Sequence, residues 1–348
     1  MAYSILILGA SYGSLLGTKL LMAGHDVTLV CRQATADLIN RNGTEVRIRL
    51  RGEDSHRTIK SKYLPGRLDA SAPENVDLTR YDLVALAMQE PQYGAEELKA
   101  LMALVAAARL PCLSIMNMPP LPYLRRISTI DTDGVLGAFS DPSVWDGFEP
   151  GLVTLCSPDP QAFRPPDEAA NVLHVGLPTS FKAARFESDA HTRILEELEE
   201  DIAAVRLDGM DVPVKLRVSE SLFVPLAKWS MLLTGNYRCI TGGEPRAIRD
   251  AVHGDIEASK RVYTHVGAIA QALGGSPEDQ VPFEKYAKAA ESLLKPSSAA
   301  RAVAAGATRI ERVDKLVQGL SVTLGMAHDV IDQTVATVDA SLAANAKG

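Results

Sequence analysis

Residues 3–31 read YSILILGASYGSLLGTKLLMAGHDVTLVC, and this stretch decides the fold. The apolar run 3–8 predicts a buried strand, and residues 14–23 have a helical pattern that ends at Gly24, a residue type common just after helices. Residues 25–31 predict a second buried strand. A strand, a glycine-containing turn, a helix and a strand within about 30 residues predict a βαβ unit with a parallel sheet.

The alternation of strands and helices continues to residue 218. Further strands of the same sheet are expected at 81–88, 110–116, 134–140, 151–156, 172–176 and 212–218, and helices at 96–108 and 189–205. From Ser219 onward the pattern is helical, with segments at 221–235, 245–272, 283–294, 297–305, 308–324 and 328–342. We therefore predict an α/β Rossmann-type N-terminal domain, residues 1–218, followed by an all-α C-terminal domain, residues 219–348.

Composition excludes several classes of protein. The chain has 36 Lys and Arg against 43 Asp and Glu, and this net charge of −7 argues against a nucleic-acid-binding protein. Its four cysteines form no CxxC pair and its seven histidines show no paired spacing, so neither a metal site nor a disulfide framework is expected. No signal peptide or membrane span is apparent in the pattern, and we expect a soluble cytoplasmic protein.

The glycine turn is the first candidate site. A turn between the first strand and the first helix places backbone N–H groups and the helix dipole against a pyrophosphate. The residues fit the spacing Gly9-x3-Gly13-x3-Gly17 better than G-x-G-x-x-G. We predict cofactor contacts from the turn itself, Gly9, Ala10, Ser11, Tyr12 and Gly13; the alternative is a tight strand–helix turn that binds nothing.

The residue after the second strand bears on the choice of cofactor. An acidic residue at this place bonds the ribose 2′-hydroxyl of NAD, whereas an arginine accommodates the 2′-phosphate of NADP. This chain has Arg32 there and no acid between Val30 and Thr35. The pattern favours NADP(H), with an ordinary surface charge as the alternative role of Arg32.

Further motifs make the chain resemble the ketopantoate reductases, a family of NADPH-dependent enzymes in the wider 6-phosphogluconate-dehydrogenase-like group. The resemblance covers nearly the whole chain in the order of the family. It rests on Gly13–Gly17, Ala23–Val27, Leu29–Arg32, Asp82–Gln89 with Gln92, Ser114–Asn117, Leu226–Trp229, Asn236, Pro296–Ser298 and the segment after Gly306.

The resemblance implies hydride transfer from NADPH to the ketone carbon of a 2-oxo acid. By position, Lys228 matches the family lysine that supplies the proton, and Asn117 matches the asparagine between nicotinamide and substrate. Asn236, eight positions after Lys228 and so about two helical turns away, matches a second asparagine, and Ser298 a serine that holds the substrate carboxylate. The alternatives are a surface lysine at a helix start, a turn asparagine before two prolines and a helix-capping serine.

The chain also departs from the family pattern. Gln89, at the cofactor-binding position that ends the third strand, replaces a lysine, and Leu232 replaces an asparagine. Arg309 aligns with the glutamate of the helical domain; the nearest acid, Glu311, would point about 200° away on a helix. The guanidinium of an arginine presents parallel N–H donors that can bind a second carboxylate of the substrate. We therefore expect Arg309 to bind substrate in an altered pocket.

These observations predict a cytoplasmic NADPH-dependent reductase of a small 2-oxo acid, with Lys228 and Asn117 as catalytic residues. Residues 1–218 would bind the cofactor and residues 219–348 the substrate. An opine- or imine-type reductase and a secondary-alcohol dehydrogenase are alternatives on the same scaffold, and a catalytically silent NADPH-binding sensor is an alternative of another class. The alanine-rich C-terminal helices could bury a homodimer seam or their own core, and the sequence leaves both open.

Overall fold

The computed structural model describes residues 2–347 and divides into two compact units. The first, called the sheet unit, comprises Met1–Met88, Gln92–Tyr123 and Ser143–Glu220. The second, called the helical unit, comprises Gln89–Pro91, Leu124–Pro142 and Ser221–Gly348. Two short segments from the first 150 residues therefore cluster with the C-terminal part, so neither unit is one continuous stretch of the chain.

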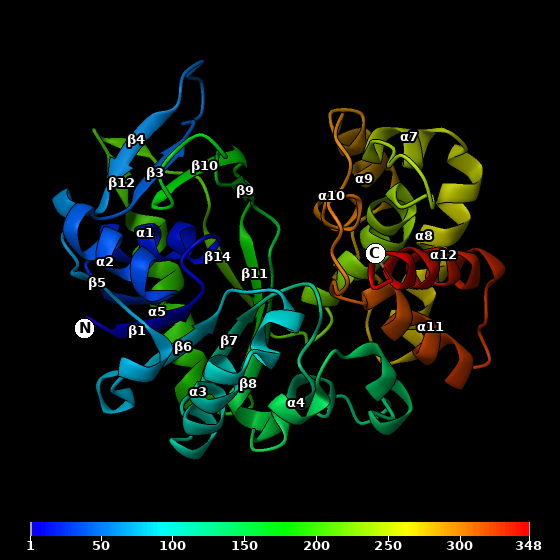
Figure 1. The fold of residues 1–348 in the computed structure, drawn as a ribbon, viewed down its shortest axis with the longest axis horizontal. Helices are drawn as coiled ribbons and strands as arrows, with labels where there is room; N and C mark the ends of the chain where they lie inside the picture. The colour runs from blue at the N-terminus through cyan, green and yellow to red at the C-terminus, as the bar shows by residue number, and fades with distance from the viewer. Residues whose placement is uncertain (1, 348) are drawn as a thin grey trace. The chain divides into compact units, whose positions relative to one another are not determined.

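The sheet unit is built on one eight-stranded sheet (Figure 1). All its neighbouring strands are parallel except β8 and β11. In spatial order the strands are β14 (Leu216–Ser219), β11 (Phe181–Ala184), β8 (Val153–Ser157), β7 (Cys112–Ile115), β6 (Leu83–Leu86), β1 (Ser4–Leu8), β2 (Asp26–Val30) and β5 (Leu68–Ser71). This sheet and the helices around it confirm the predicted Rossmann-type α/β fold.

Helices cover both faces of this sheet. Ile5 and Ile7 share one hydrophobic core with the buried residues of α1 (Gly13–Met22) and α5 (Asp189–Ala204). Because successive strand residues point to opposite faces, Leu6 and Leu8 face the other side, where α3 (Glu96–Ala107) buries its own apolar stripe. The helix α2 (Gln33–Asn42) follows β2 and packs beside β5.

A second, four-stranded sheet lies in the same unit. Its order is β4 (Arg57–Lys60), β3 (Glu45–Ile48), β10 (Val172–Leu177) and β9 (Gln161–Phe163), and a separate hairpin joins β12 (Arg206–Leu207) to β13 (Met210–Asp211). Placing residues 172–176 in the main sheet was therefore wrong. The strand β10 is buried at its start and exposed at Gly176 and Leu177, as a peripheral strand is, rather than buried throughout.

The strand expected at 134–140 was also wrong. These residues form a 3-10 helix, Asp133–Ala138, in the helical unit. Their buried positions are Val135, Ala138 and Phe139, a spacing of three and four that suits a helix and not the period of two of a strand.

The helical unit contains the expected helices with changed boundaries. They are α6 (Lys228–Met231), α7 (Ile248–His253), α8 (Ile256–Ala272), α9 (Phe283–Ala290), α10 (Ser298–Ala304), α11 (Val313–Thr323) and α12 (Asp329–Asn345); the short α4 (Leu121–Leu124) precedes them in the chain. The single helix expected over 245–272 is broken at Gly254, because the Asp255 side chain accepts the N–H of Ala258 and starts a new helix. The helix expected from 308 begins only at Val313.

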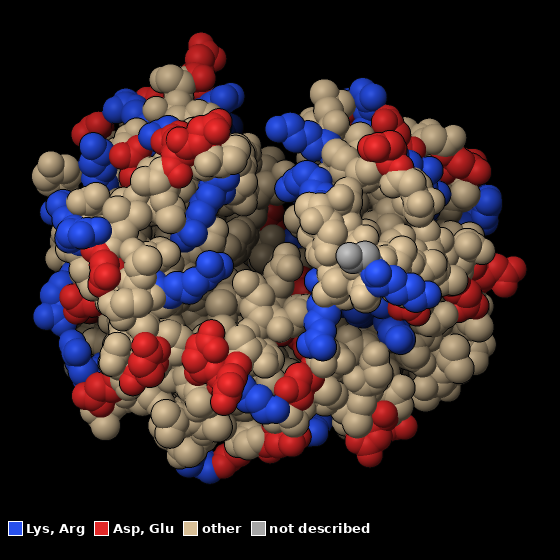
Figure 2. All heavy atoms as spheres, in the orientation of Figure 1, with Lys and Arg blue, Asp and Glu red and all other residues tan. Residues whose placement is uncertain are grey.

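Charged side chains of both signs are interspersed over the viewed face of each unit (Figure 2). Among the described residues, no helix combines the length and the apolar character that crossing a membrane requires.

Candidate functional site

Four parallel strands end at one edge of the main sheet. The last residues of β1, β2 and β6 lie in one row across it with the next-to-last residue of β7: Leu8, Val30, Leu86 and Ser114. The segments that follow these strands therefore leave the sheet side by side. This carboxyl edge is where open α/β sheets bind ligands, and the glycine turn, Arg32 and Asn117 all follow strands that end there.

The glycine turn passes too close to its neighbours for any larger residue. Gly9 has φ +110°, and a Cβ atom there would lie 2.6 Å from Met88 Cγ and 2.7 Å from the Ala87 carbonyl oxygen. At Gly13 a Cβ would lie 2.6 Å from Ile7 Cγ2. Glycine at these two positions therefore lets the turn leave β1 tightly and lets α1 begin directly against the sheet.

The N-terminus of α1 offers free donors for an anion. Tyr12 occupies the N-cap without a capping hydrogen bond from its side chain, and the first turn contains no acidic residue. The Tyr12 hydroxyl instead donates to the Pro160 carbonyl oxygen at 2.6 Å, and burial raises the pKa of this hydroxyl. The Ser14 hydroxyl donates to the Ala10 carbonyl oxygen. Uncapped N–H groups and a helix dipole behind a glycine turn fit the pyrophosphate of a dinucleotide.

Arg32 lies directly beyond β2 in an extended conformation and is the N-cap residue of α2. Its side chain is exposed. The N–H of Gly9 donates to the Val30 carbonyl oxygen at 3.0 Å, so the glycine turn and the end of β2 are adjacent. The structure thus brings Arg32 to the same edge of the sheet as the turn.

Gln89 and Asn117 follow β6 and β7. Asn117 is half-buried and precedes the two prolines that lead into α4. Gln89 is exposed and belongs, with Glu90 and Pro91, to the segment that clusters with the helical unit. Asn117 therefore belongs to the sheet unit, and Gln89 does not.

In the helical unit, Lys228 and Asn236 lie at the two ends of one continuous helical stretch, in which α6 is followed by a π-helical turn. Lys228 is the first residue of α6 and is half-buried. Residues Leu232–Asn236 form a π-helical turn, in which the N–H of Tyr237 donates to the Leu232 carbonyl oxygen five positions back. Two α-helical turns span about 7.2 residues, and the wider π turn absorbs the excess in the eight-residue spacing. Lys228 and Asn236 consequently lie closer to one helix face than a regular α-helix would place them.

A tyrosine supports this π turn. The Tyr286 hydroxyl donates to the Met231 carbonyl oxygen at 3.1 Å, which satisfies an acceptor beside the irregular turn. A Cβ atom at Gly235 would lie 2.1 Å from the Tyr286 hydroxyl oxygen. Glycine at position 235 is therefore what allows the hydroxyl to approach.

The two serines at the start of α10, Ser297 and Ser298, differ in their contacts. Ser297 is the N-cap residue: its hydroxyl accepts the N–H of Ala300 at 3.1 Å and donates to the Asn236 carbonyl oxygen at 2.7 Å. The helix-capping role considered for Ser298 thus belongs to its neighbour. Ser298 is the first helical residue and its side chain is exposed.

Arg309 and Glu311 lie in a non-helical segment before α11, which removes the basis for the predicted 200° separation. Arg309 is exposed, whereas Glu311 is 6% exposed. A carboxylate oxygen of Glu311 accepts the N–H of Glu90, and the Tyr237 hydroxyl donates to the Glu311 carbonyl oxygen. The structure therefore buries the acid two positions after the arginine that the sequence aligned with the family glutamate.

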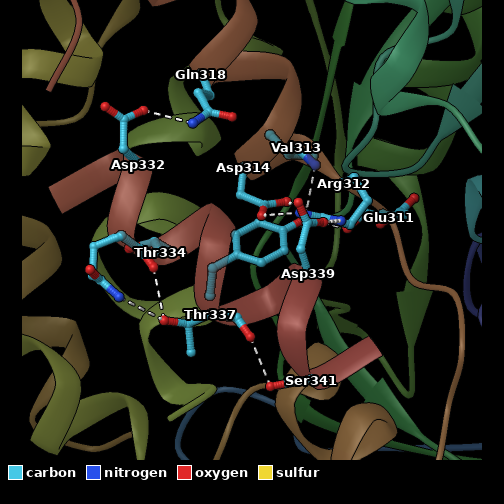
Figure 3. Close-up of polar contacts among 12 residues, drawn as sticks. Glu311, Arg312, Val313, Asp314, Gln318, Asp332, Thr334, Thr337, Asp339 and Ser341 are labelled. Atoms are coloured by element: carbon cyan, nitrogen blue, oxygen red, sulfur yellow. Dashed lines mark hydrogen bonds and ion pairs between the residues drawn. The ribbon is translucent and has the colours of Figure 1, made fainter. Parts of the chain in front are cut away.

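Polar contacts hold the backbone around Glu311. The N–H of Val313 donates to the Tyr237 hydroxyl oxygen at 3.0 Å, so this one hydroxyl bridges both ends of the segment 311–313. Arg312 pairs with the fully buried Asp314 and with Asp339 of α12. In Figure 3 the side chain of Glu311 points away from the Arg312–Asp314–Asp339 cluster. This network fixes the segment without using the Glu311 carboxylate.

Glu90 is a residue that the sequence analysis missed. It is 3% exposed, and one carboxyl oxygen accepts the N–H of Ser140 at 3.0 Å. Its other oxygen is buried without a hydrogen-bond partner in the described chain. Burial raises the pKa of this carboxyl, and the nearby charge of Glu311 adds to the effect. The signal in the sequence was an acid four positions after the end of β6 and directly before Pro91.

The sequence matches one family model, described as ketopantoate reductase PanE/ApbA, over residues 5–105. This stretch holds the glycine turn, Arg32 and Gln89, and the match confirms the resemblance predicted from the motifs. Among curated proteins no sequence match was found.

Solved structures extend the likeness to the whole chain. A PanE/ApbA family ketopantoate reductase from Ralstonia eutropha has 18% identity, a TM-score of 0.65 and coverage of 99% of both chains. A 2-dehydropantoate 2-reductase from Methylococcus capsulatus has 14% identity and a TM-score of 0.67, over 99% of this chain and 98% of that one. A D-mandelate dehydrogenase solved with NADH and anilino(oxo)acetate has 14% identity, a TM-score of 0.64 and 99% coverage of both chains. The whole chain therefore has the ketopantoate reductase fold.

Proposed function

We propose that this protein is an NADPH-dependent reductase of a 2-oxo acid. The observation that carries the proposal is the carboxyl edge of the main sheet. A turn that only glycine fits leads there into an uncapped helix N-terminus, and the adjacent strand ends at an arginine instead of an acid. The family match over residues 5–105 and the likeness to 2-oxo acid reductases and a D-mandelate dehydrogenase support it.

The sheet unit would hold the cofactor. The backbone N–H groups of Ala10, Ser11, Tyr12 and Gly13 would face the pyrophosphate, and Arg32 the 2′-phosphate. Asn117, at the same edge, would orient the nicotinamide and the substrate through its amide. Gln89, which follows β6 but clusters with the helical unit, would contact the cofactor as a neutral replacement for a lysine. When bound, NADPH supplies the hydride.

The helical unit would supply the proton and hold the acid. Lys228 Nζ would donate a hydrogen bond to the ketone oxygen and give up a proton as that oxygen becomes an alkoxide, a contribution of about 10²- to 10⁴-fold to the rate. Asn236, turned toward the Lys228 face by the π turn, would orient the same oxygen. Ser298, exposed at the N-terminus of α10, would bond the substrate carboxylate.

The buried carboxylate of Glu311 is a further candidate for binding the substrate. A carboxylate that accepts hydrogen bonds can hold a hydroxyl of the substrate or the ammonium of a lysine, and Tyr237 and Arg312 fix its backbone. The exposed Arg309, on the same segment, would then be available for a second carboxylate of a larger acid.

The test is turnover by the full chain. Loss of NADPH absorbance would be followed with ketopantoate and a panel of other 2-oxo acids. The replacement Lys228→Met should lower kcat about 100-fold or more and leave NADPH binding within twofold of wild type. The matched control is Lys285→Met, which removes an exposed lysine of α9 in the same unit.

Other results would assign other functions. Reduction only when an amine accompanies the 2-oxo acid would identify an opine- or imine-type reductase, and turnover only from NADP⁺ with an alcohol would identify a dehydrogenase. NADPH binding with no turnover of any substrate, and no effect of Lys228→Met, would contradict the enzyme and favour a sensor.

A further inference from the structure

Arg164 is a half-buried cation that the sequence analysis did not single out. It follows β9, at the edge of the second sheet, and lies within electrostatic reach of Cys31 and Arg32 at the end of β2. Burial lowers the pKa of its guanidinium, and the positive charge of Arg32 lowers it further. Two arginines from segments more than 100 residues apart therefore lie near enough for the charge of Arg32 to act on Arg164.

Specific contacts hold the segment that carries Arg164. The Tyr12 hydroxyl, from the N-cap of α1, donates to the Pro160 carbonyl oxygen. Asp159 accepts a hydrogen bond from the Ser157 hydroxyl and pairs with Lys182 Nζ at 3.1 Å. The chain between β8 and β9 is thus tied at Pro160, four positions before Arg164, to the turn that precedes α1. The same turn is bonded to the end of β2, because the N–H of Gly9 donates to the Val30 carbonyl oxygen.

The described part of the chain provides no acidic partner for the guanidinium of Arg32 or of Arg164. Within residues 2–347, neither Arg32 nor Arg164 forms an ion pair or a side-chain hydrogen bond, and no carboxylate is among the groups that shift the pKa of Arg164. Placing a half-buried guanidinium beside a like charge is unfavourable unless an anion joins them. Arginine pairs are well suited to phosphate, because each guanidinium presents parallel N–H donors.

We propose that Arg164 and Arg32 together bind the 2′-phosphate of NADP(H), which makes Arg164 a residue that determines cofactor specificity. This inference rests on the proposed function, since it concerns the same cofactor site. A phosphate monoester carries a charge of about −1.5 to −2 at pH 7, so one arginine leaves much of it uncompensated and a second nearly completes the balance. The phosphate would give the half-buried Arg164 an anionic partner and would offset the like charge of Arg32.

The test is binding, measured by titrating the purified full chain with NADPH, NADH, adenosine 2′,5′-bisphosphate and AMP. We expect Arg164→Ala to weaken NADPH and the bisphosphate about 10- to 100-fold and to leave NADH and AMP within about twofold. The variant Arg164→Lys keeps the charge but loses the parallel N–H donors of the guanidinium, so its affinity for NADPH and the bisphosphate should lie between those of wild type and Arg164→Ala.

Arg193→Ala is the matched control, because it removes an exposed arginine from α5 of the same unit. It should leave all four affinities unchanged. Equal weakening of NADPH and NADH by Arg164→Ala, or no change in NADPH, would overturn the role of Arg164 while leaving the reductase proposal intact. A wild-type protein that binds no dinucleotide would overturn both proposals. Thermal melting of each variant shows that the comparison is between folded proteins.

Discussion

Replacing Lys19 by methionine should raise the free energy of unfolding at neutral pH, and this gain should be smaller at alkaline pH. Lys19 lies in the last turn of α1, is 2% exposed, and donates from Nζ to the Val212 carbonyl oxygen at 3.1 Å. Burial lowers its pKa from 10.5 to about 7, and the charge of Lys215 lowers it as well. Methionine keeps a similar length and shape without the charge.

The magnitude follows from this shift. The folded pKa lies below the unfolded one, so between about pH 7 and 10.5 the unfolded chain binds more protons and the contribution of Lys19 to stability rises with pH. At about 1.4 kcal/mol per pKa unit, the buried amine costs about 4 kcal/mol at pH 7 and about 2 kcal/mol at pH 9. The lost hydrogen bond to Val212 costs the variant about 1–3 kcal/mol at either pH and does not affect the difference between them.

The assay is urea unfolding of wild type and Lys19→Met at both pH values. The advantage of the variant in free energy of unfolding should shrink by about 2 kcal/mol from pH 7 to pH 9. Lys62→Met, which removes an exposed lysine of the same unit, is the control for general charge effects. An advantage that stays constant within about 0.5 kcal/mol across this range would refute the reasoning, because Lys19 would then titrate alike in both states.

Three other changes test the site. Gly9→Ala should cost about 1–3 kcal/mol in unfolding free energy and abolish dinucleotide binding, because a Cβ atom there would collide with the Ala87 carbonyl. The control is Gly17→Ala, where the atom nearest to the added Cβ would be 3.4 Å away; it should be neutral or stabilise the protein by up to about 1 kcal/mol. Equal effects of the two variants in a urea titration would contradict the close approach at Gly9. Tyr237→Phe removes the hydroxyl that bridges the ends of the Glu311 segment and should cost about 1–3 kcal/mol and lower kcat with NADPH binding unchanged; an unaltered kcat would show that the segment needs no such support. For Glu90, whose pKa is raised by folding, wild-type stability should fall as the pH rises above the unfolded value of 4.5, so Glu90→Gln should gain on wild type with rising pH in thermal melts. A parallel pH dependence of the two proteins would mean that folding does not raise the pKa of this carboxyl.

The sequence was most informative where structure is local. Residues 3–31 predicted β1, α1 and β2 almost to their boundaries, because the strand–turn–helix pattern and Gly24 act over neighbouring positions. It was least informative for peripheral segments. Residues 172–176 have the apolar character of a main-sheet strand, yet they pair with β3 and β9, and nothing local in such a short run determines which sheet it will join.

The helical unit shows the same limit. The helix expected from residue 308 fails to start before Val313, where Tyr237 and the Arg312–Asp314 pair fix the chain in a non-helical path. A helical wheel drawn through Arg309 and Glu311 was therefore the wrong geometry. The π turn at Leu232–Asn236 is equally invisible in the periodicity, because Tyr286, 50 positions beyond Asn236, supplies the hydroxyl that supports it.

The sequence by itself determined that the chain has a Rossmann-type sheet with a glycine turn, an arginine after the second strand and a following all-α part. Each of these depends on residues that lie within a turn or two of one another. Only the tertiary structure decided that Glu311 and Glu90 are buried together, and that Arg164 comes within electrostatic reach of Arg32. The physical reason is that burial and the proximity of charges depend on which distant segments pack together. The sequence around a single acid or arginine does not state whether that side chain ends in water or in the core.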